Sequence, residues 1–451
     1  MKKRAKFLTI LLIFAVFLSF PARFAAYSPE FALQSRGGYI VNLNTGTVVF
    51  DENCDETFNP AYLTQIMTMA LVLEKCPDID GTILTAPAYI FNDIYNKGLP
   101  TADVRPGEEI SVKDLLYSLS LQSSCEAANV LADYIGGGSL TAFVDMMNKK
   151  AAELGCENTK FVTAHGGIFT KDHQYTTAKD MYKICKYALS QERFREIAVA
   201  STYVVPKNNK HANGKPLQTY NQMINSVNGG VYYTPNARGI KVSNGSEVAD
   251  RCLVTLGVKG ENEYLLVLFG APAKDAQGKT IAEIGTFTDA KKLIDWCFSS
   301  FEVKTVLNTD DVIAQATNIK GAKGQDFVLL MPEEEYTALM HSNVSTASFQ
   351  RAYTINENIS APIKKGQVLG TVTLRLKNED VFTTNLVAAT DIERSTAGHY
   401  ASLIGDFFNS TWFKIIVCVL FLLVFAYVVI TVIVNKRSRK FKKSKRQNIF
   451  K

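Results

Sequence analysis

The sequence predicts an α+β protein, an antiparallel sheet covered by helices, followed by a small β-rich module and one membrane helix. Apolar residues recur at helical spacing between residues 61 and 189, whereas β-rich runs gather between residues 240 and 269. Near the C-terminus, a stretch of twenty residues carries no charge. A chain of 451 residues with 47% hydrophobic and 20% charged residues can bury a sizeable core, which excludes wholesale disorder.

The first elements expected are a hairpin over residues 37–50, around Asn44-Thr45-Gly46, and a helix over residues 61–75. Val112–Ile135 contains two helical stretches that are interrupted at Gln122-Ser123-Ser124, and another helical pattern covers Thr177–Leu189. Strands are then expected at 240–241, 252–258 and 264–269, with a helix near 289–298.

This mixture of core helices and late strands predicts an α+β domain over residues 27–300. Residues 303–392 differ in character, because short strands, turns and glycines replace the long helical patterns. We interpret them as a separate β-rich C-terminal domain. Residues 393–411 are then expected to connect this domain to the membrane.

Both ends of the chain predict export. Residues 1–26 combine a basic start with the apolar run Phe7–Phe20 and a small-residue patch ending at Ala25-Ala26, which is typical of a signal peptide. The alternative is an uncleaved anchor, because neither alanine has a small residue two positions upstream. Ile415–Val434 would form about 30 Å of helix, the thickness of a bilayer core.

The basic tail predicts the orientation of that helix. We expect a transmembrane helix over residues 412–434, with Trp412 at its outer edge and a cytoplasmic tail over residues 435–451. Nine lysines and arginines lie between Lys436 and Lys451. The localisation expected is therefore the cell membrane, with a single span and the bulk of the chain extracytoplasmic.

Charge and cysteine content argue against two classes of function, nucleic-acid binding and metal or cofactor binding. The net charge is +6, but the two ends supply thirteen positive charges and leave about −7 on the rest, which argues against nucleic acid as a partner. The eight cysteines form neither a CxxC pair nor a cluster with histidine, so no metal site and no cofactor are expected.

Several stretches together resemble one family, the serine D-alanyl-D-alanine carboxypeptidases, which are low-molecular-mass penicillin-binding proteins that trim peptidoglycan stem peptides. The resemblance implies a penicillin-binding, β-lactamase-like α+β domain followed by a small β-sandwich. The stretches that carry it begin with GTVVFDENCDETFNPAYLTQIMTMALVLEK and include residues 46–75, 104–137, 158–167, 175–181, 287–298 and 361–374.

The activity of the family rests on three motifs. In S-x-x-K, the lysine one helical turn away takes the proton of the nucleophilic serine. In S-x-N, a hydroxyl relays a proton and an amide holds the substrate. In K-T-G, a cation and a hydroxyl hold the terminal carboxylate of the substrate, and the glycine lets the peptide lie against the strand.

The same positions are degenerate in this chain. Alignment on the first motif places Tyr62 where the serine should be and Gln65 where the lysine should be. The second motif is Ser123-Ser124-Cys125, and the third is Lys241-Val242-Ser243, so only Ser123 and Lys241 match the family. Val242 and Ser243 are expected to add bulk where a substrate backbone would approach.

No catalytic residue is therefore intact, and the sequence predicts a pseudoenzyme. The first hypothesis is a membrane-anchored protein that binds peptidoglycan stem peptides or regulates wall-synthesis proteins. Lys241 and Ser123 are then the ligand-binding candidates, because a cation can still attract a peptide carboxylate. The rivals are an active carboxypeptidase with a rewired site, for example one that uses Cys125, and an interaction scaffold with a vestigial cleft.

Overall fold

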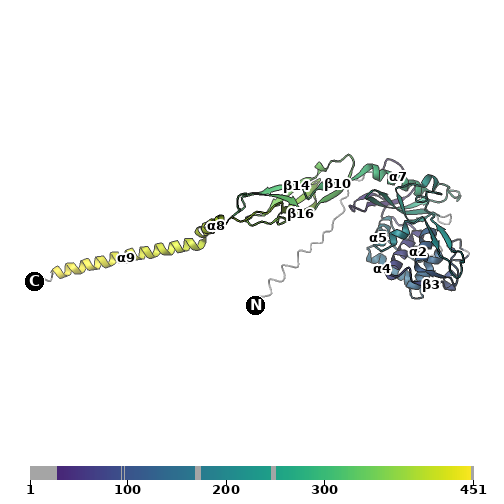
Figure 1. The fold of residues 1–451 in the computed structure, drawn as a ribbon, viewed down its shortest axis with the longest axis horizontal. Coiled ribbons are helices and arrows are strands. Elements are labelled where there is room, and N and C mark those ends of the chain that lie inside the picture. Colours follow the sequence, from purple (N-terminus) through teal and green to yellow (C-terminus); the bar gives the residue numbers. More distant parts are fainter. Residues whose placement is uncertain (1–27, 93, 96, 168–173, 245–249, 448–451) are drawn as a thin grey trace. The chain divides into compact units, whose positions relative to one another are not determined.

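The computed structural model describes residues 28–92, 94–95, 97–167, 174–244 and 250–447, and the predicted signal peptide lies outside them. The chain divides into two compact units (Figure 1). The first comprises residues 1–304 and 338–344, and the second comprises residues 305–337 and 345–451.

A five-stranded antiparallel sheet forms the centre of the first unit. Its order, β2-β1-β9-β8-β7, places the N-terminal hairpin beside strands that lie more than 200 residues later in the chain. The strands are β2 (Val48–Glu52), β1 (Gly37–Asn42), β9 (Asn262–Pro272), β8 (Asp250–Lys259) and β7 (Ala237–Ser243). The predicted hairpin and late strands are thereby confirmed, and β7, with the third motif, lies at one edge.

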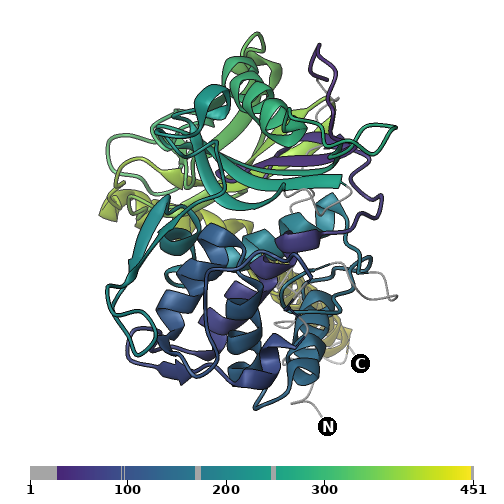
Figure 2. The ribbon, with the colours of Figure 1, turned by 90° about the vertical axis from the view of Figure 1, so that its right-hand side faces the viewer.

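Helices cover both faces of this sheet (Figure 2). One face packs against α1 (Gln65–Lys75) and α5 (Ala178–Leu189), behind which lie α2 (Val112–Gln122), α3 (Cys125–Ile135) and α4 (Leu140–Glu153). The other face packs against α7 (Gly285–Ser300). The fold class expected from the sequence, an antiparallel sheet covered by helices, is confirmed.

Serine side chains begin three consecutive helices of the first unit. Ser111, Ser124 and Ser139 each accept a hydrogen bond from the main-chain N–H three residues later, which satisfies a donor that the first helical turn leaves unpaired. The predicted break at residues 122–124 is the boundary between α2 and α3. Helices α4 and α6 (Phe194–Ala198) had not been predicted.

Short elements complete the first unit. Two small antiparallel pairs, β3 with β4 and β5 with β6, flank the helices. The bounds of these and of the 3-10 turns are η1 (Ala61–Thr64), β3 (Ile83–Thr85), η2 (Ala88–Phe91), β4 (Glu109–Ser111), β5 (Thr202–Val205), β6 (Lys215–Gln218) and η3 (Gly230–Tyr232).

The second unit is built mainly from one antiparallel sheet in the order β11-β12-β16-β15-β14. Its buried side chains include Val328, Leu330, Val372 and Leu386. The strands are β11 (Ala314–Ala316), β12 (Val328–Pro332), β16 (Glu379–Ala388), β15 (Val368–Leu376) and β14 (Gln350–Ile355), with the turn η4 (Thr346–Ser348). A separate pair joins β10 (Phe301–Leu307) and β13 (Tyr336–His341), and residues 301–304 and 338–341 of these strands belong to the first unit. This β-rich content agrees with the prediction.

Two helices end the described chain. Residues 393–411, predicted as a plain connector, contain the helix α8 (Thr396–Asn409). The next helix, α9 (Thr411–Gln447), includes Thr411–Lys436, which is long and apolar enough to cross a membrane; within the described residues no other helix qualifies. The apolar side chains of residues 415–434 are exposed, and near its start α9 contacts α8 through Phe413.

Candidate functional site

The first motif lies at the junction of η1 and α1. Tyr62 is the second residue of η1, and Gln65 begins α1. The main-chain N–H of Gln65 donates to the carbonyl of Tyr62, so the two residues are one helical turn apart, as their spacing predicts. In this chain the turn presents a phenol and an amide where the family places a serine and a lysine.

Tyr62 is a packed core residue. Its side chain is 3% exposed and belongs to a buried cluster with Ala61, Ile94, Leu99, Cys125 and Ala273. An aromatic ring removed from water in this way contributes chiefly by burying apolar area. The ring therefore occupies the position from which a nucleophile would act.

The side chain of Gln65 joins the first motif to the second. Its Nε2 donates to the carbonyl oxygen of Ser123 over 3.1 Å and to that of His165 over 3.0 Å. Its Oε1 is buried and has no hydrogen-bond partner within the described residues. An amide that is neutral at all accessible pH values cannot serve as a general base here.

The second motif is a tight turn between two helices. Ser123 ends α2 with a φ of 53°, in the left-handed region, and Ser124 caps α3. Cys125 is the first residue of α3, is fully buried and points its thiol toward the carbonyl of Ser123 at 3.7 Å. Ser123 and Cys125 are thus brought to Gln65 and Tyr62, as the family resemblance implies.

Lys241, the retained lysine of the third motif, points from β7 toward the helices. Its side chain is 2% exposed, and Nζ donates to the carbonyl of Leu119 and, over 3.3 Å, to that of Ser120. These carbonyls belong to the last turn of α2, where a cation is favourable. Burial lowers the pKa of Lys241 to about 7, and the electrostatic influence of nearby Cys125 opposes that shift.

The predicted carboxylate-binding role of Lys241 remains a prediction. A ligand carboxylate would have to draw the amine away from two main-chain acceptors and from a buried position. The sequence could not reveal this, because the acceptors lie about 120 residues earlier in the chain.

Val242 and Ser243 occupy different environments. Val242 packs into the core cluster that includes Phe287 and Leu293 of α7, on the opposite face of the sheet from Lys241. The expectation that Val242 obstructs a substrate is therefore corrected: alternation along the strand turns it away. Ser243 is fully buried, and its Oγ lacks a hydrogen-bond partner in the described part of the chain.

The loop at His165 packs closely against the backbone of the first motif. Gly166 has a φ of +79°, and a Cβ atom there would lie 2.0 Å from the carbonyl oxygen of Ala61, so only glycine fits. His165 is buried, and its Nδ1 accepts the N–H of Gly167 over 3.0 Å. These contacts assign His165 a structural role.

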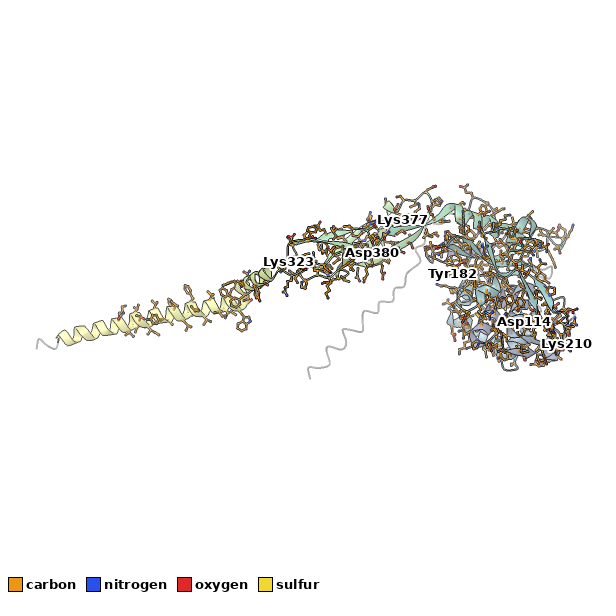
Figure 3. All side chains as sticks on the ribbon, viewed as in Figure 1. Asp114, Tyr182, Lys210, Lys323, Lys377 and Asp380 are labelled. Atoms are coloured by element: carbon orange, nitrogen blue, oxygen red, sulfur yellow. The ribbon has the colours of Figure 1, made fainter. Side chains whose placement is uncertain are left out.

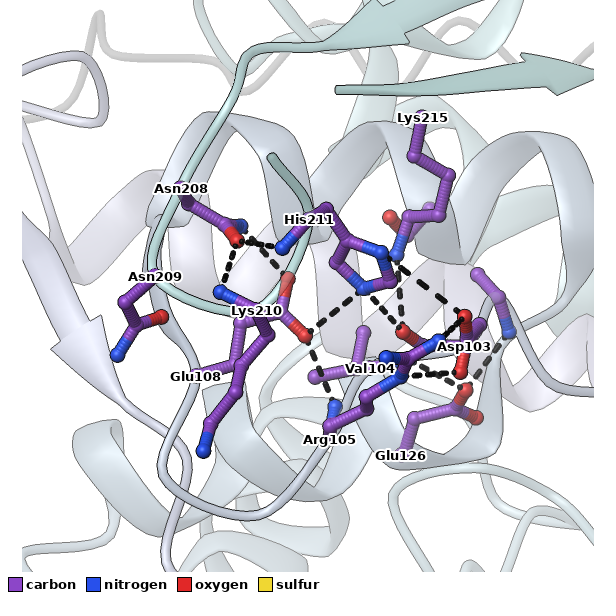
Figure 4. Close-up of polar contacts among 12 residues, drawn as sticks. Asp103, Val104, Arg105, Glu108, Glu126, Asn208, Asn209, Lys210, His211 and Lys215 are labelled. Atoms are coloured by element: carbon purple, nitrogen blue, oxygen red, sulfur yellow. Dashed lines mark hydrogen bonds and ion pairs between the residues drawn. The ribbon is translucent and has the colours of Figure 1, made fainter. Parts of the chain in front are cut away.

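A polar network behind the second motif was missed by the sequence reasoning (Figure 4). The carbonyl of Pro100 accepts the N–H of Cys125, and the carboxylate of Glu126 accepts the N–H of Ala102 over 2.7 Å. Burial raises the pKa of Glu126. These hydrogen bonds join the segment over residues 99–108 to the start of α3. Leu99 of this segment packs in the same buried cluster as Tyr62.

The same segment is fastened on its outer side by the loop between β5 and β6. Buried Glu108 accepts hydrogen bonds from the N–H of Arg105 and from Nδ2 of Asn208. His211 Nε2 lies 2.9 Å from the carbonyl of Asp103 and 3.5 Å from Oε2 of Glu108 (Figure 4). No local sequence pattern identifies this network, because the burial of Glu108 and Glu126 is evident only in the structure.

Tyr62, Gln65, Ser123, Cys125 and Lys241 therefore lie in one buried region, whereas Val242 packs on the other face of the sheet. Tyr62 contacts the cluster of Cys125, Gln65 bonds to the turn of Ser123, and Lys241 caps α2. Within the described residues no group of three histidine, cysteine or acidic side chains is arranged to hold a metal ion. The chemistry available is that of a buried thiol and a buried amine.

Comparison with known proteins identifies the family of both parts of the chain. Residues 23–273 match the family described as D-alanyl-D-alanine carboxypeptidase, and residues 301–394 match the penicillin-binding protein 5 C-terminal domain. The chain is 28% identical over 395 residues to the D-alanyl-D-alanine carboxypeptidase DacF of Bacillus subtilis, covering 86% of this chain and 95% of that protein. For DacC of Escherichia coli the identity is 27% over 406 residues, covering 88% and 92%.

Solved structures show the same fold. The crystal structure of penicillin-binding protein 5 from Haemophilus influenzae superposes with a TM-score of 0.58 at 23% identity, covering 81% of this chain and all of that one. A peptidoglycan synthesis regulatory factor, PBP3, from Streptococcus pneumoniae gives a TM-score of 0.60 at 19% identity, covering 80% and 100%. With more than half of its length matched, the chain belongs to the D-alanyl-D-alanine carboxypeptidase family.

Proposed function

We propose that this protein is a catalytically inactive member of its family, anchored in the cell membrane, that acts on cell-wall synthesis through binding. The observation that carries this proposal is the pair Tyr62 and Gln65. A packed phenol replaces the nucleophile, and an amide bound to two carbonyls replaces the base. Loss of a nucleophilic serine costs a hydrolase on the order of 10⁶ in rate, about 8 kcal/mol.

The strongest rival is a thiol enzyme that uses Cys125 with Lys241 as its base. Their electrostatic interaction and the lowered pKa of Lys241 favour such a pairing. Burial argues against it, because Cys125 has no exposed surface and Tyr62 and Leu99 pack beside it. A substrate carbonyl would have to displace this apolar layer to reach the sulfur.

Labelled penicillin distinguishes these possibilities. The full chain in detergent should form no stable covalent adduct, whereas an active relative treated in parallel should be labelled stoichiometrically. Mass spectrometry of the treated protein provides the measurement. An adduct on Cys125 would replace our proposal with the thiol enzyme, and an adduct on any other residue of the site would also refute inactivity.

Binding without turnover leaves two candidates for what the protein recognises, a stem peptide or a protein partner. The burial of Lys241 and its two carbonyl bonds favour a protein partner over a peptide held at the motif site. Calorimetry with a pentapeptide ending in D-Ala-D-Ala tests this choice. We expect no binding at millimolar concentration; binding that Lys241→Ala weakens about 10- to 150-fold would instead support the stem peptide.

The apolar part of α9 supports a single membrane span with the folded units outside the cytoplasm. Basic residues follow this apolar part, and the positive-inside rule places such residues in the cytoplasm. This topology would bring the protein to the same compartment as the cell wall.

A further inference from the structure

A polar groove of about 350 Å³ lies in the second unit, between the ends of β11 and β14. These are the two edge strands of the five-stranded sheet. Among the residues that line it are Gln315, Asn318, Lys320, Ile355, Asn356 and Asn358.

Main-chain hydrogen bonds connect the two chain segments on one side of this groove. Beyond the ends of β11 and β14, the N–H of Lys320 donates to the carbonyl of Ile359 over 3.0 Å, and the N–H of Ala361 donates to that of Lys320 over 2.9 Å. These bonds hold the two edges together on one side of the groove. Asn318 and Asn358 have φ values of 60° and 56°, a conformation that asparagine tolerates better than most residues.

The side chains of the groove are available for a ligand. Within the described part of the chain, no hydrogen bond engages the amides of Gln315, Asn318 or Asn356. Lys320 Nζ donates to Oδ1 of Asn358 over 3.3 Å, which holds one cation at the groove. None of the described lining residues is acidic.

We propose that this groove binds an N-acetylated amino sugar that carries a carboxylate, as found in peptidoglycan glycan strands. Amide side chains both donate and accept, which suits the hydroxyl and acetamido groups of such a sugar. Ile355 offers an apolar surface for the C–H face of the ring, and Lys320 offers a cation for the carboxylate. The volume lies at the lower end of small-ligand sites, which suits one or two sugar rings.

Strand β14 also carries an exposed aromatic residue near Ile355. Tyr353 is 52% exposed and lies two residues before Ile355 on β14, so the alternation of the strand turns both side chains to one face. An extended peptide is the less suitable occupant, because β11 is only three residues long and offers little edge for added strand pairing.

The test uses the full chain in detergent micelles with two probes. One is the disaccharide of N-acetylglucosamine and N-acetylmuramic acid with its carboxylate free. The other is the neutral dimer of N-acetylglucosamine, N,N′-diacetylchitobiose. We expect the acidic disaccharide to bind in the high micromolar to millimolar range by calorimetry. Asn356→Ala should weaken both probes about tenfold, through loss of an amide that both donates and accepts.

Lys320→Gln separates charge recognition from general damage to the fold. This substitution should weaken the affinity for the acidic disaccharide about fivefold and leave the affinity for the neutral disaccharide unchanged. Lys377→Gln, at an exposed lysine in the turn between β15 and β16, is the matched control and should change neither affinity (Figure 3). Melting temperatures of the three variants equal to that of the wild type would show that the fold is intact.

Three results would overturn the inference: no binding of the acidic disaccharide at 10 mM, binding that the groove variants leave unchanged, or binding of an extended peptide alone. The inference does not depend on inactivity of the motif site. A penicillin adduct would refute the proposed function but would not contradict sugar binding at the groove.

Discussion

Nε2 of Gln65 donates to the carbonyl oxygen of Ser123 over 3.1 Å, so the helix of the first motif is bonded directly to the turn of the second. The same atom also donates to the carbonyl of His165. One amide therefore joins the first motif, the second motif and the loop at His165. The family resemblance implies a lysine base at this position, and in this chain a glutamine makes a structural contact there.

Gln65→Ala should destabilise the protein by about 2–3 kcal/mol, because two buried carbonyls lose their donor and a cavity remains. Urea unfolding of the full chain in detergent measures this change. Gln277→Ala, at an exposed glutamine whose side chain makes no hydrogen bond among the described residues, is the control and should stay within about 0.5 kcal/mol of the wild type. Equal losses for both variants would contradict the assigned role of Gln65.

Restoring the lost pair by Tyr62→Ser with Gln65→Lys should produce little carboxypeptidase activity. Removal of the buried ring leaves a cavity that costs about 3–5 kcal/mol, and Ser243 remains where the family has glycine. Release of D-alanine from a pentapeptide measures the activity. Turnover near that of an active relative would show that these two positions alone were responsible for the loss.

The buried amine of Lys241 should make stability depend on pH. Its pKa is about 7 in the folded protein, below the ordinary value of 10.5, so between these values the unfolded chain binds more protons. The free energy of unfolding should therefore rise as pH increases from about 7 to about 10.5, by up to about 1.4 kcal/mol per pH unit from this group.

Lys241→Met should flatten this part of the stability profile, whereas Lys274→Met, at an exposed lysine, should keep it. Urea unfolding at a series of pH values supplies both curves. An unchanged slope in Lys241→Met would mean that the amine stays protonated in the folded protein.

Glu108→Ala should loosen the segment over residues 99–108, because the N–H of Arg105 and Nδ2 of Asn208 lose a buried acceptor. A loss of about 2–4 kcal/mol is expected. The specific readout is faster reaction of Cys125 with a thiol reagent, located by mass spectrometry, since this segment packs over it. Glu109→Ala, at the exposed neighbouring acid, should leave the reaction rate unchanged; equal rates in both variants would contradict the covering role.

Protease added to intact cells should remove the folded units and spare a small C-terminal fragment that contains α9. This follows from the apolar span of Thr411–Lys436 and the basic residues after it. An antibody against the C-terminal tail detects the fragment. Protection of the whole chain would reverse the proposed orientation.

The sequence by itself determined the elements whose signals are local. The break at residues 122–124, the hairpin over residues 37–50 and the strands β8 and β9 were predicted because helical and β periodicity depend on neighbouring residues. The degenerate motifs were also evident from the sequence, since the spacing of Tyr62 and Gln65 survives within one helical turn. Helix α8 was missed, and the residues around it were predicted as a plain connector.

Only the tertiary structure decided how the motif residues are used. Lys241 meets its carbonyl partners across about 120 residues, and Val242 contacts α7 because that helix covers the face of the sheet to which strand alternation turns the side chain. The segment over residues 99–108 covers Cys125 through bonds to a loop that begins about 100 residues later. Such polar pairings depend on where helices, loops and sheet edges meet in space, and no local periodicity encodes that meeting.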